Sequence, residues 1–249
     1  MLPLRAPYSN NSVCQAEFTW AIGIPVLNIT EGCRRCCSTG FRKVGTCMGR
    51  SKMETGVVLR SHPDLPLTHL EPEAPVGLVV VLTGYGKGKT TSALGMLLRS
   101  CGHGKRVVMI QFMKGDIHSG EWEAIQKLAC DVMLIPSGMG FCGIQGNPFA
   151  HARHREAAQQ ALALAREKIA SGECDVLILD EINNALHLKL VDLEQVLEIV
   201  RGKPSLMHLI LTGRDAHPDV IALADTVSEV VEIKHAYRKD ISPQPGIDY

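Results

Sequence analysis

The stretch GLVVVLTGYGKGKTT at residues 77–91 decides the fold of this chain. Its first half is a continuous run of Val and Leu, which is typical of a strand covered on both faces of a parallel sheet. Its second half is rich in glycine and leads into residues 93–97, whose apolar side chains can pack one face of a helix. The sequence therefore predicts a strand, a glycine-rich loop and a helix in direct succession, which is the context of a phosphate-binding loop.

The loop at 84–91 has the residue types that phosphate binding requires. Glycines let backbone N–H groups approach phosphate oxygens, and the start of a helix adds a partial positive charge. Lys89 can neutralise phosphate charge and the Thr90 hydroxyl can hold Mg²⁺. The usual pattern has glycine where this chain has Thr83, so the loop is a variant, and a glycine-rich turn without a ligand is the alternative. Phosphate contacts are expected from Gly84, Tyr85, Gly86, Lys87, Gly88, Lys89, Thr90 and Thr91.

Apolar runs alternate with amphipathic stretches through the rest of the chain. Strands are predicted at 77–83, 105–112, 131–135, 175–180, 206–212 and 227–233. Helices are predicted at 89–101, 119–129, 150–171, 192–201 and 218–224. This alternation indicates an α/β fold in which a mostly parallel sheet is flanked by helices, a three-layer sandwich like that of phosphate-loop NTPases.

Two acids follow the predicted strand at 175–180, where a phosphate-loop protein keeps its metal-organising carboxylates. The carboxyl ends of parallel strands point toward one crevice, so these acids should face the phosphate loop. We expect Asp180 to orient the shell of a bound Mg²⁺, and Glu181 to contact the metal or its waters, or to activate a water. The alternative is an ordinary strand followed by an acidic helix cap.

Two cations follow other predicted strands. Lys114 comes after the strand at 105–112, and Arg214 after the strand at 206–212. Both could complete a cationic rim around a polyphosphate, although isolated residues of this kind are commonly solvated surface charges. His151 and His154 are interpreted as surface residues of a helix rather than as metal ligands.

Composition argues against several classes of partner. The 26 basic and 26 acidic residues give a formal net charge of +0, so no overall field recruits nucleic acid or an anionic membrane. No uninterrupted apolar run is long enough to cross a bilayer. Any bound anion must therefore be held locally.

Residues 1–76 differ from the rest, because seven prolines interrupt them and no helical or strand period is sustained. We interpret them as an irregular or disordered extension, or as translation from a start placed too early, with Met53 as an internal start. Cys33 and Cys36 form a single CxxC spacing, and no second ligand pair stands at a familiar distance to complete a zinc site. The expected domain is 77–249. Nine cysteines, an odd number, without a signal peptide favour a reducing cytoplasm over a secreted disulfide framework.

The motifs taken together resemble the ATP:corrinoid adenosyltransferases of cobalamin biosynthesis and salvage. The resemblance covers residues 77–249, in the order that the family has, and includes the variant phosphate loop. Its motifs are GYGKGKTTSALGMLLRSCGHGKRV at 84–107, QFMKG at 111–115, LDEINNAL at 179–186, LTGRDAHPDVIALADTVSEV at 211–230, IKHAY at 233–237 and GIDY at 246–249.

The resemblance implies a specific reaction. A Co(I) corrinoid, such as cob(I)yrinic acid a,c-diamide, cobinamide or cobalamin, attacks the 5′ carbon of ATP and expels tripolyphosphate. Because the cobalt is the nucleophile, the protein needs no side-chain base and must orient the carbon and stabilise charge on the leaving group. Lys89 and Glu181 would then be catalytic, Mg²⁺ or Mn²⁺ would bind at Thr90, Asp180 and Glu181, and Arg99, Lys114 and Arg214 would bound the nucleotide.

The same resemblance implies a corrinoid-binding loop at residues 137–143, which displaces the lower axial ligand of the cobalt with bulky side chains. Where the family pattern has two aromatics, this chain has Met139 and Phe141. Met can fill the same space flexibly, although a mobile surface loop is the alternative. The resemblance further implies a cytoplasmic homodimer that receives electrons from a flavoprotein-type donor.

Two other functions remain open from the sequence. A phosphate-loop phosphohydrolase or kinase would use Glu181 to activate water or a hydroxyl and would produce ADP. A non-catalytic corrinoid or nucleotide-binding regulator would bind both ligands without forming a product.

Overall fold

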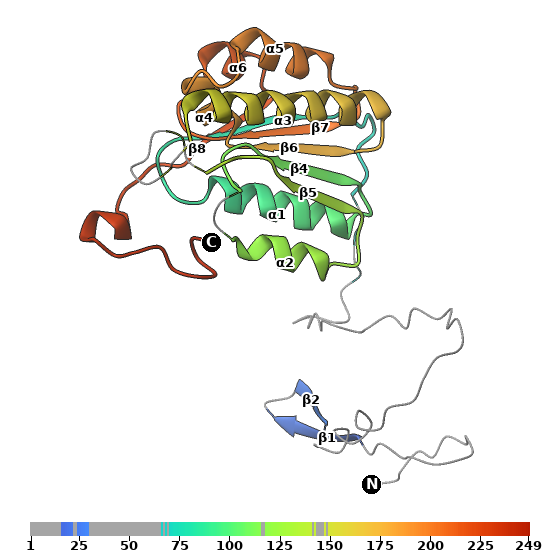
Figure 1. Ribbon diagram of the computed structural model, residues 1–249. Coiled ribbons are helices and arrows are strands. Elements are labelled where there is room, and N and C mark those ends of the chain that lie inside the picture. Colours follow the sequence, from blue (N-terminus) through green and yellow to red (C-terminus); the bar gives the residue numbers. More distant parts are fainter. Residues whose placement is uncertain are drawn as a thin grey trace, which may run out of the picture. The chain divides into compact units, whose positions relative to one another are not determined.

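The computed structural model describes residues 16–21, 24–29, 66, 68, 70–115, 118–140, 142, 147 and 149–249 (Figure 1). The chain divides into two compact units, Met1–Thr68 and His69–Tyr249. None of the described helices has the length and apolar character needed to span a bilayer.

In the first unit the structure describes one pair of strands. β1 (Ala16–Ala21) pairs antiparallel with β2 (Ile24–Ile29). No regular element was predicted in residues 1–76, because six-residue strands are too short to set up a sustained period, although their aromatic and branched side chains favour strands. The cysteines at 33–47 and Met53 lie outside the described residues.

The second unit is built on a six-stranded parallel sheet with the order β5-β4-β6-β7-β3-β8. Its strands are β3 (Val79–Thr83), β4 (Val107–Gln111), β5 (Val132–Pro136), β6 (Val176–Asp180), β7 (His208–Thr212) and β8 (Thr226–Glu229). All six predicted strands are confirmed. The last strand is shorter than predicted, because the chain leaves the sheet at Val230, whose carbonyl accepts the backbone N–H of Gly86 at 2.7 Å.

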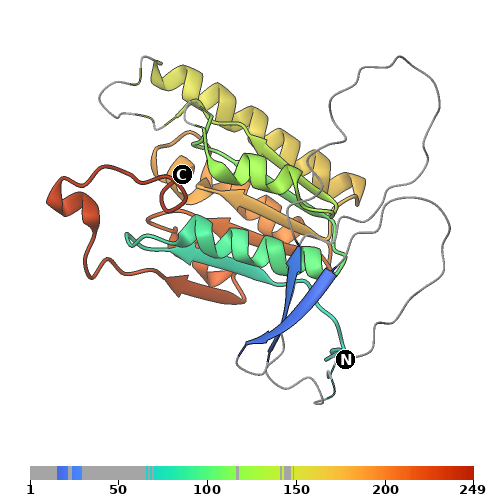
Figure 2. The ribbon, with the colours of Figure 1, turned by 90° about the horizontal axis from the view of Figure 1, so that it is seen from below.

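Helices cover both faces of this sheet, so the predicted three-layer arrangement is confirmed (Figure 1, Figure 2). One face carries α1 (Lys89–Gly102) and α2 (Gly120–Gln126), and the other carries α3 (His151–Ser171), α4 (Ile182–His187), α5 (Leu193–Gly202) and α6 (Pro218–Ala222). A 3-10 helix, η1 (Ala236–Lys239), lies in the C-terminal segment. The six-residue α4 was not predicted, because it is too short to show a period.

In each central strand, successive side chains point to opposite faces of the sheet and pack in two different hydrophobic cores. In β4, for example, Val107 and Met109 pack with α1, whereas Val108 and Ile110 pack with the helices of the opposite face. This two-sided burial explains the continuous apolar runs in the sequence. Because all six strands are parallel, their carboxyl ends meet at one edge, and the polar residues that follow them are brought together there.

Candidate functional site

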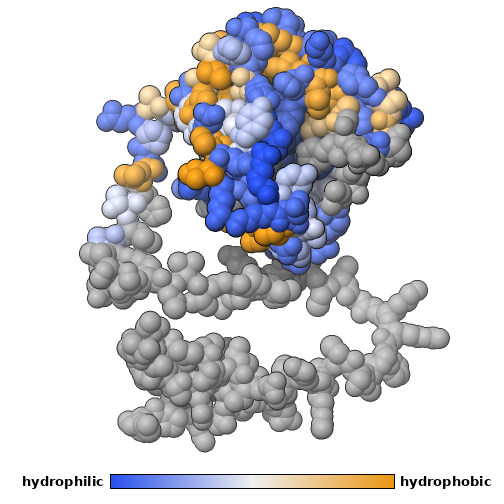
Figure 3. Space-filling view, turned by 90° about the vertical axis from the view of Figure 1, so that its left-hand side faces the viewer, coloured by the Kyte–Doolittle hydropathy of each residue, from blue (hydrophilic) through white to orange (hydrophobic). Residues whose placement is uncertain are grey.

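A cavity of about 860 Å³ opens at the carboxyl edge of the sheet. One side is the loop at 85–91, the floor includes Lys114, Glu121 and Glu181, and the other side is the C-terminal segment 232–249. Figure 3 views the second unit from this edge, where hydrophilic residues predominate around the middle of the face. The predicted phosphate loop therefore lines this cavity together with residues from at least four other parts of the chain.

The glycines of the loop are required by its shape. Gly84 and Gly88 have φ values of 93° and 126°, which L side chains rarely adopt. A Cβ atom at Gly84 would also lie 2.5 Å from the carbonyl oxygen of Val230, and one at Gly86 would lie 2.7 Å from that of Val231. The segment after β8 therefore crosses directly against the loop. Thr83, at the position where the usual pattern has glycine, accepts the backbone N–H of Ala216 at its hydroxyl.

Lys89 opens α1 and is only 7% exposed. Its ammonium group donates to the carbonyl oxygens of Gly84, at 2.7 Å, and Gly86, at 3.0 Å. Burial lowers the pKa of Lys89, against the opposing influence of Glu181 and Asp180. The ammonium is thus held inside the loop at the cavity wall, where a phosphate group would meet it.

The two acids at the end of β6 have different surroundings. Asp180 is fully buried, and its Oδ1 accepts the hydroxyls of Thr90, at 2.9 Å, and Thr212, at 2.7 Å. Glu181 lines the cavity in a left-handed conformation (φ 65°), and its N–H donates to Thr212 Oγ1 at 2.9 Å. The hydroxyl of Thr212 therefore links both acids, a role that sequence reasoning missed because it depends on β7 lying beside β6.

Both acids are costly to ionise in their present surroundings. Burial raises the pKa of Asp180. Burial, followed by the charge of Asp180, raises the pKa of Glu181 to about 7, although Lys89 opposes the shift. Glu181 Oε2 is buried without a hydrogen-bond partner among the described residues. A cation beside these carboxylates would relieve both effects.

The donor set fits Mg²⁺. Thr90, Asp180 and Glu181 offer hydroxyl and carboxylate oxygens, the ligands that this hard cation prefers. In the part of the chain that the structure describes, no three His, Cys, Asp or Glu side chains form a cluster able to hold a metal. A metal here would thus need phosphate and water ligands as well, which is how Mg²⁺ usually binds in phosphate-transfer sites.

A second polar network lies on the α2 side of the cavity. Lys114 Nζ donates to Glu121 Oε1 at 2.7 Å, and Gln111 Nε2 donates to the same oxygen at 3.1 Å. Glu121 Oε2 accepts the hydroxyl of Ser119. Burial alone would raise the pKa of Glu121, but the hydrogen bonds from Lys114 and Ser119 lower it to about 2. Glu121 was not predicted, because nothing in its local sequence distinguishes it.

The rim beside the loop is formed by an aromatic and cationic pair. The guanidinium carbon of Arg214 lies 5.5 Å from the centroid of the Tyr85 ring, and the Tyr85 hydroxyl donates to Asp215 Oδ1 at 2.7 Å. Both Tyr85 and Arg214 line the cavity. This contact places the cation of Arg214 beside the loop at the edge of the cavity.

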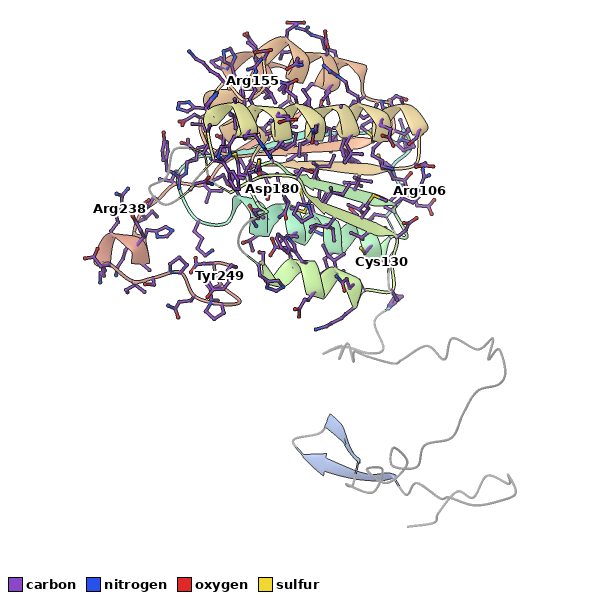
Figure 4. The ribbon with its side chains drawn as sticks, in the orientation of Figure 1. Arg106, Cys130, Arg155, Asp180, Arg238 and Tyr249 are labelled. Atoms are coloured by element: carbon purple, nitrogen blue, oxygen red, sulfur yellow. The ribbon has the colours of Figure 1, made fainter. Side chains whose placement is uncertain are left out.

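The C-terminal segment forms the wall that faces the loop. Lys87 Nζ lies 3.0 Å from Asp248 Oδ1, and His235, Tyr237 and Tyr249 also line the cavity. Figure 4 labels Tyr249 in this segment and Asp180 at the end of its strand. That this segment lines the cavity could not be predicted, because nothing in its local sequence reveals which part of the fold it contacts.

The remaining predicted site residues lie elsewhere. Arg99 is exposed in the last turn of α1, about 15 Å along the helix axis from Lys89, and does not line the cavity. Met139 is partly buried in the loop after β5 and does not line it either, and its carbonyl accepts Asn147 Nδ2 at 2.8 Å. Phe141 lies outside the described residues.

The interpretation of His154 as a surface residue was wrong. His151 is exposed, but His154 is 3% exposed and its ring lies 6.4 Å from that of Phe149. It occupies the buried face of α3 together with Ala158, Ala161 and Leu162, which follow at helical spacing. The polar composition around it concealed this face in the sequence.

Comparisons with known proteins agree with the geometry. Residues 75–249 match the family model described as ATP:corrinoid adenosyltransferase BtuR/CobO/CobP. A corrinoid adenosyltransferase of Escherichia coli strain K12 is 35% identical over 173 residues, which cover 70% of this chain and 86% of that protein. Corrinoid adenosyltransferases of a Sinorhizobium species and of Salmonella typhimurium strain LT2 are 38% and 33% identical over 175 and 177 residues, which cover 70% of this chain and 80% and 86% of those proteins.

Proposed function

The chain belongs to the ATP:corrinoid adenosyltransferase family, and on that premise we propose that residues 77–249 form its catalytic domain. The protein is an ATP-dependent transferase that moves the 5′-deoxyadenosyl group of ATP to the cobalt of a reduced corrinoid. The observation that carries the assignment to this cavity is that the loop lysine Lys89 and the acid Glu181 line the same cavity.

In this reaction the main task of the protein is to stabilise the negative charge that develops on the leaving tripolyphosphate. The electron pair of Co(I) forms the bond to C5′, while the bond from C5′ to the α-phosphate oxygen breaks and its electrons leave with tripolyphosphate. Groups fixed beforehand around the leaving oxygens lower this barrier more than flexible ones would, because they need no rearrangement as the charge develops. Lys89, Lys114 and Arg214, all at the cavity wall, are our candidates.

We propose that Thr90 and Glu181 hold Mg²⁺ or Mn²⁺. Asp180 would orient the Thr90 hydroxyl by accepting its hydrogen bond. Such an ion would neutralise polyphosphate charge. Support comes from the oxygen donors, from the buried unpartnered Glu181 Oε2 and from the raised pKa of Glu181. Arg99 is not part of the proposed site, since it lies at the far end of α1.

For the corrinoid we propose the loop that carries Met139 and Phe141. Its support is the way this loop is fixed to the loop that carries Lys114. Gly138 N–H donates to the Lys114 carbonyl at 2.9 Å, and a Cβ at Gly115 would lie 1.9 Å from the Gly138 carbonyl oxygen. Gly115 and Gly138 thus let the two backbones pack together, which places the proposed corrinoid loop next to the segment that carries Lys114.

We also propose that the enzyme works as a cytoplasmic homodimer and takes electrons from a flavoprotein-type donor. The support is the family membership. Light scattering during gel filtration tests the dimer directly, and a monomeric mass for the active protein would refute it.

The assignment is tested by anaerobic incubation with ATP, Mg²⁺ and chemically reduced cobalamin. We expect a light-sensitive cobalt–carbon product and one tripolyphosphate for each adenosyl group transferred. Formation of ADP and phosphate instead would identify a phosphohydrolase or kinase. Binding of ATP and cobalamin without any product would identify a regulator.

A further inference from the structure

Glu121 is an unexpected residue for a cavity that binds a polyanion. It lies in the first turn of α2 and lines the cavity, and its side chain is 12% exposed. Its hydrogen bonds to Lys114 and Ser119 keep it ionised at neutral pH. A permanent negative charge beside a triphosphate opposes binding, so its presence calls for a role in the reaction.

The hydrogen bonds of Gln111 fix the position of this carboxylate. The indole N–H of Trp122 can only donate, so the Gln111 atom that faces it at 2.9 Å must be the acceptor Oε1. Gln111 Nε2 is therefore turned toward the acids, and it donates to Glu121 Oε1 at 3.1 Å and to Asp180 Oδ2 at 3.3 Å. Gln111 thus links Glu121 to Asp180, which lies on the side of the cavity where the metal is proposed to bind.

The oxygens of Glu121 are largely occupied by the protein. Oε1 accepts from both Lys114 and Gln111, and Oε2 accepts from Ser119. This leaves little capacity for a ligand hydroxyl. Lys114 is different, because its ammonium has three donors and only one is directed to Glu121. Two donors remain for phosphate oxygens, and their direction is set by the carboxylate.

We propose that Glu121 is a positioning residue that restrains Lys114, directing its ammonium toward the leaving oxygens and limiting its grip on the polyphosphate before and after the transfer. This inference rests on the proposed function of the cavity. A lysine free to settle on any phosphate oxygen would bind ATP and tripolyphosphate more tightly without favouring the transition state. When Glu121 restrains Lys114, part of the attraction between Lys114 and the phosphate oxygens would be realised only in the transition state, when negative charge develops on the leaving group.

A double-mutant cycle tests the proposal by a measurement that does not depend on activity. The dissociation constant of tripolyphosphate is measured by calorimetry, in EDTA and again in Mg²⁺, for wild type, Glu121→Gln, Lys114→Met and the double variant. Glu123→Gln is the matched control, because Glu123 is on the same helix, its side chain is 64% exposed, and its one ion pair among the described residues is with His118. Glutamine preserves the shape of Glu121, and thermal unfolding verifies that each variant is folded.

We expect Glu121→Gln to tighten tripolyphosphate binding about tenfold, because the Lys114 ammonium is then free to bind the phosphate oxygens with all of its donors. In the Lys114→Met background the same change should have a clearly smaller effect, because only the direct repulsion between Glu121 and the ligand is then removed. Steady-state rates should show a lower kcat for Glu121→Gln with an unchanged or lower KM for ATP. Glu123→Gln should match wild type throughout.

Three outcomes would overturn the proposal. Unchanged binding in Glu121→Gln would leave only a structural role, and equal tightening in the Lys114→Met background would mean direct repulsion of the ligand. A loss of affinity for ATP that 2′-deoxy-ATP and 3′-deoxy-ATP do not share would mean that Glu121 binds the ribose. Failure of the proposed function itself would appear separately, as wild-type protein that binds tripolyphosphate but forms no cobalt–carbon product.

Discussion

Thr212 donates its hydroxyl hydrogen to Asp180 Oδ1 at 2.7 Å, although the two residues are 32 positions apart in the chain. Thr212 Oγ1 in turn accepts the backbone N–H of Glu181 at 2.9 Å. A hydroxyl has one hydrogen to donate, and here it goes to Asp180. This pattern therefore fixes the orientation of the Thr212 hydroxyl. β7 separates the strand of the phosphate loop from the strand of the acids, and Thr212 bridges that separation.

Replacing the Thr212 hydroxyl should remove the hydrogen-bonded link between Asp180 and the backbone of Glu181. Thr212→Val leaves Asp180 and the Glu181 N–H each short of one partner in a buried place, so we expect a loss of about 1–3 kcal/mol in the free energy of unfolding. Turnover should fall as well, because Glu181 is no longer held. Urea unfolding and initial rates measure the two effects. Thr212→Ser keeps the hydroxyl and should retain most activity, and equal losses in both variants would argue against the bridge.

Lys89→Ala should remove most turnover while leaving the fold intact. Among the described residues the ammonium donates its hydrogen bonds to backbone carbonyls of its own loop, so its removal deprives no other side chain of a hydrogen-bond partner. The control is Lys127→Ala, which changes an exposed lysine after α2. Circular dichroism and the adenosylation rate are the measurements. Near-normal adenosylation in Lys89→Ala would remove the central residue of the proposed site.

Gly84→Ala should abolish ATP binding, because the new methyl group meets the Val230 carbonyl and the backbone has a φ of 93°. The loop or the segment after β8 must then shift. Gly95→Ala is the control, since a Cβ there meets nothing within 4 Å and lies inside α1. That variant should be neutral or more stable by up to about 1 kcal/mol. Unaltered ATP affinity in Gly84→Ala would show that the contact is not needed.

The pair of Arg106 and Asp175 should make stability depend on pH. Hydrogen bonds from Arg106, at 2.8 to 3.2 Å, lower the pKa of Asp175 to about 2. A depressed folded pKa stabilises the fold above the unfolded value of 3.8, and this contribution is lost as the pH falls toward 2.

Asp175→Asn should therefore be less stable at pH 7 by about 1 kcal/mol, a figure reduced for partial exposure to solvent. The difference from wild type should shrink between about pH 4 and pH 2. Urea unfolding across that range measures it. A difference that stays constant with pH would show that the ion pair is not its source.

Deleting residues 1–52 should leave adenosylation largely unchanged. The family match begins at residue 75, and the second compact unit begins at His69. The truncated protein is compared with the full chain for rate and for thermal unfolding. Loss of activity in a soluble, folded truncation would assign a catalytic role to the deleted segment.

The sheet and the loop could be predicted because their signals are local. Each strand is a short apolar run, and the loop from Gly84 to Thr91 carries its chemistry within eight successive residues. Asp180 and Glu181 could be predicted because they directly follow such a run. These positions need no knowledge of strand order.

The other cavity residues depend on which strands are neighbours. Thr212 and Gln111 reach Asp180 only because β7 and β4 flank β6. Glu121 lines the cavity because α2 lies where this side chain reaches Gln111 and Lys114, and its local sequence does not reveal that placement. The expectation for Arg99 came from the resemblance, whereas α1 carries that residue away from the loop.

The wall made by residues 232–249 has a consequence for synthesis of the protein. Domains form progressively as the chain leaves the ribosome, and this wall belongs to the last part of the second unit to emerge. The phosphate loop is translated some 150 residues earlier, so a nascent chain can fold much of its sheet while its nucleotide cleft still lacks one side. Substrate capture would then become possible only after this wall has emerged, when the pair of Lys87 and Asp248 can form.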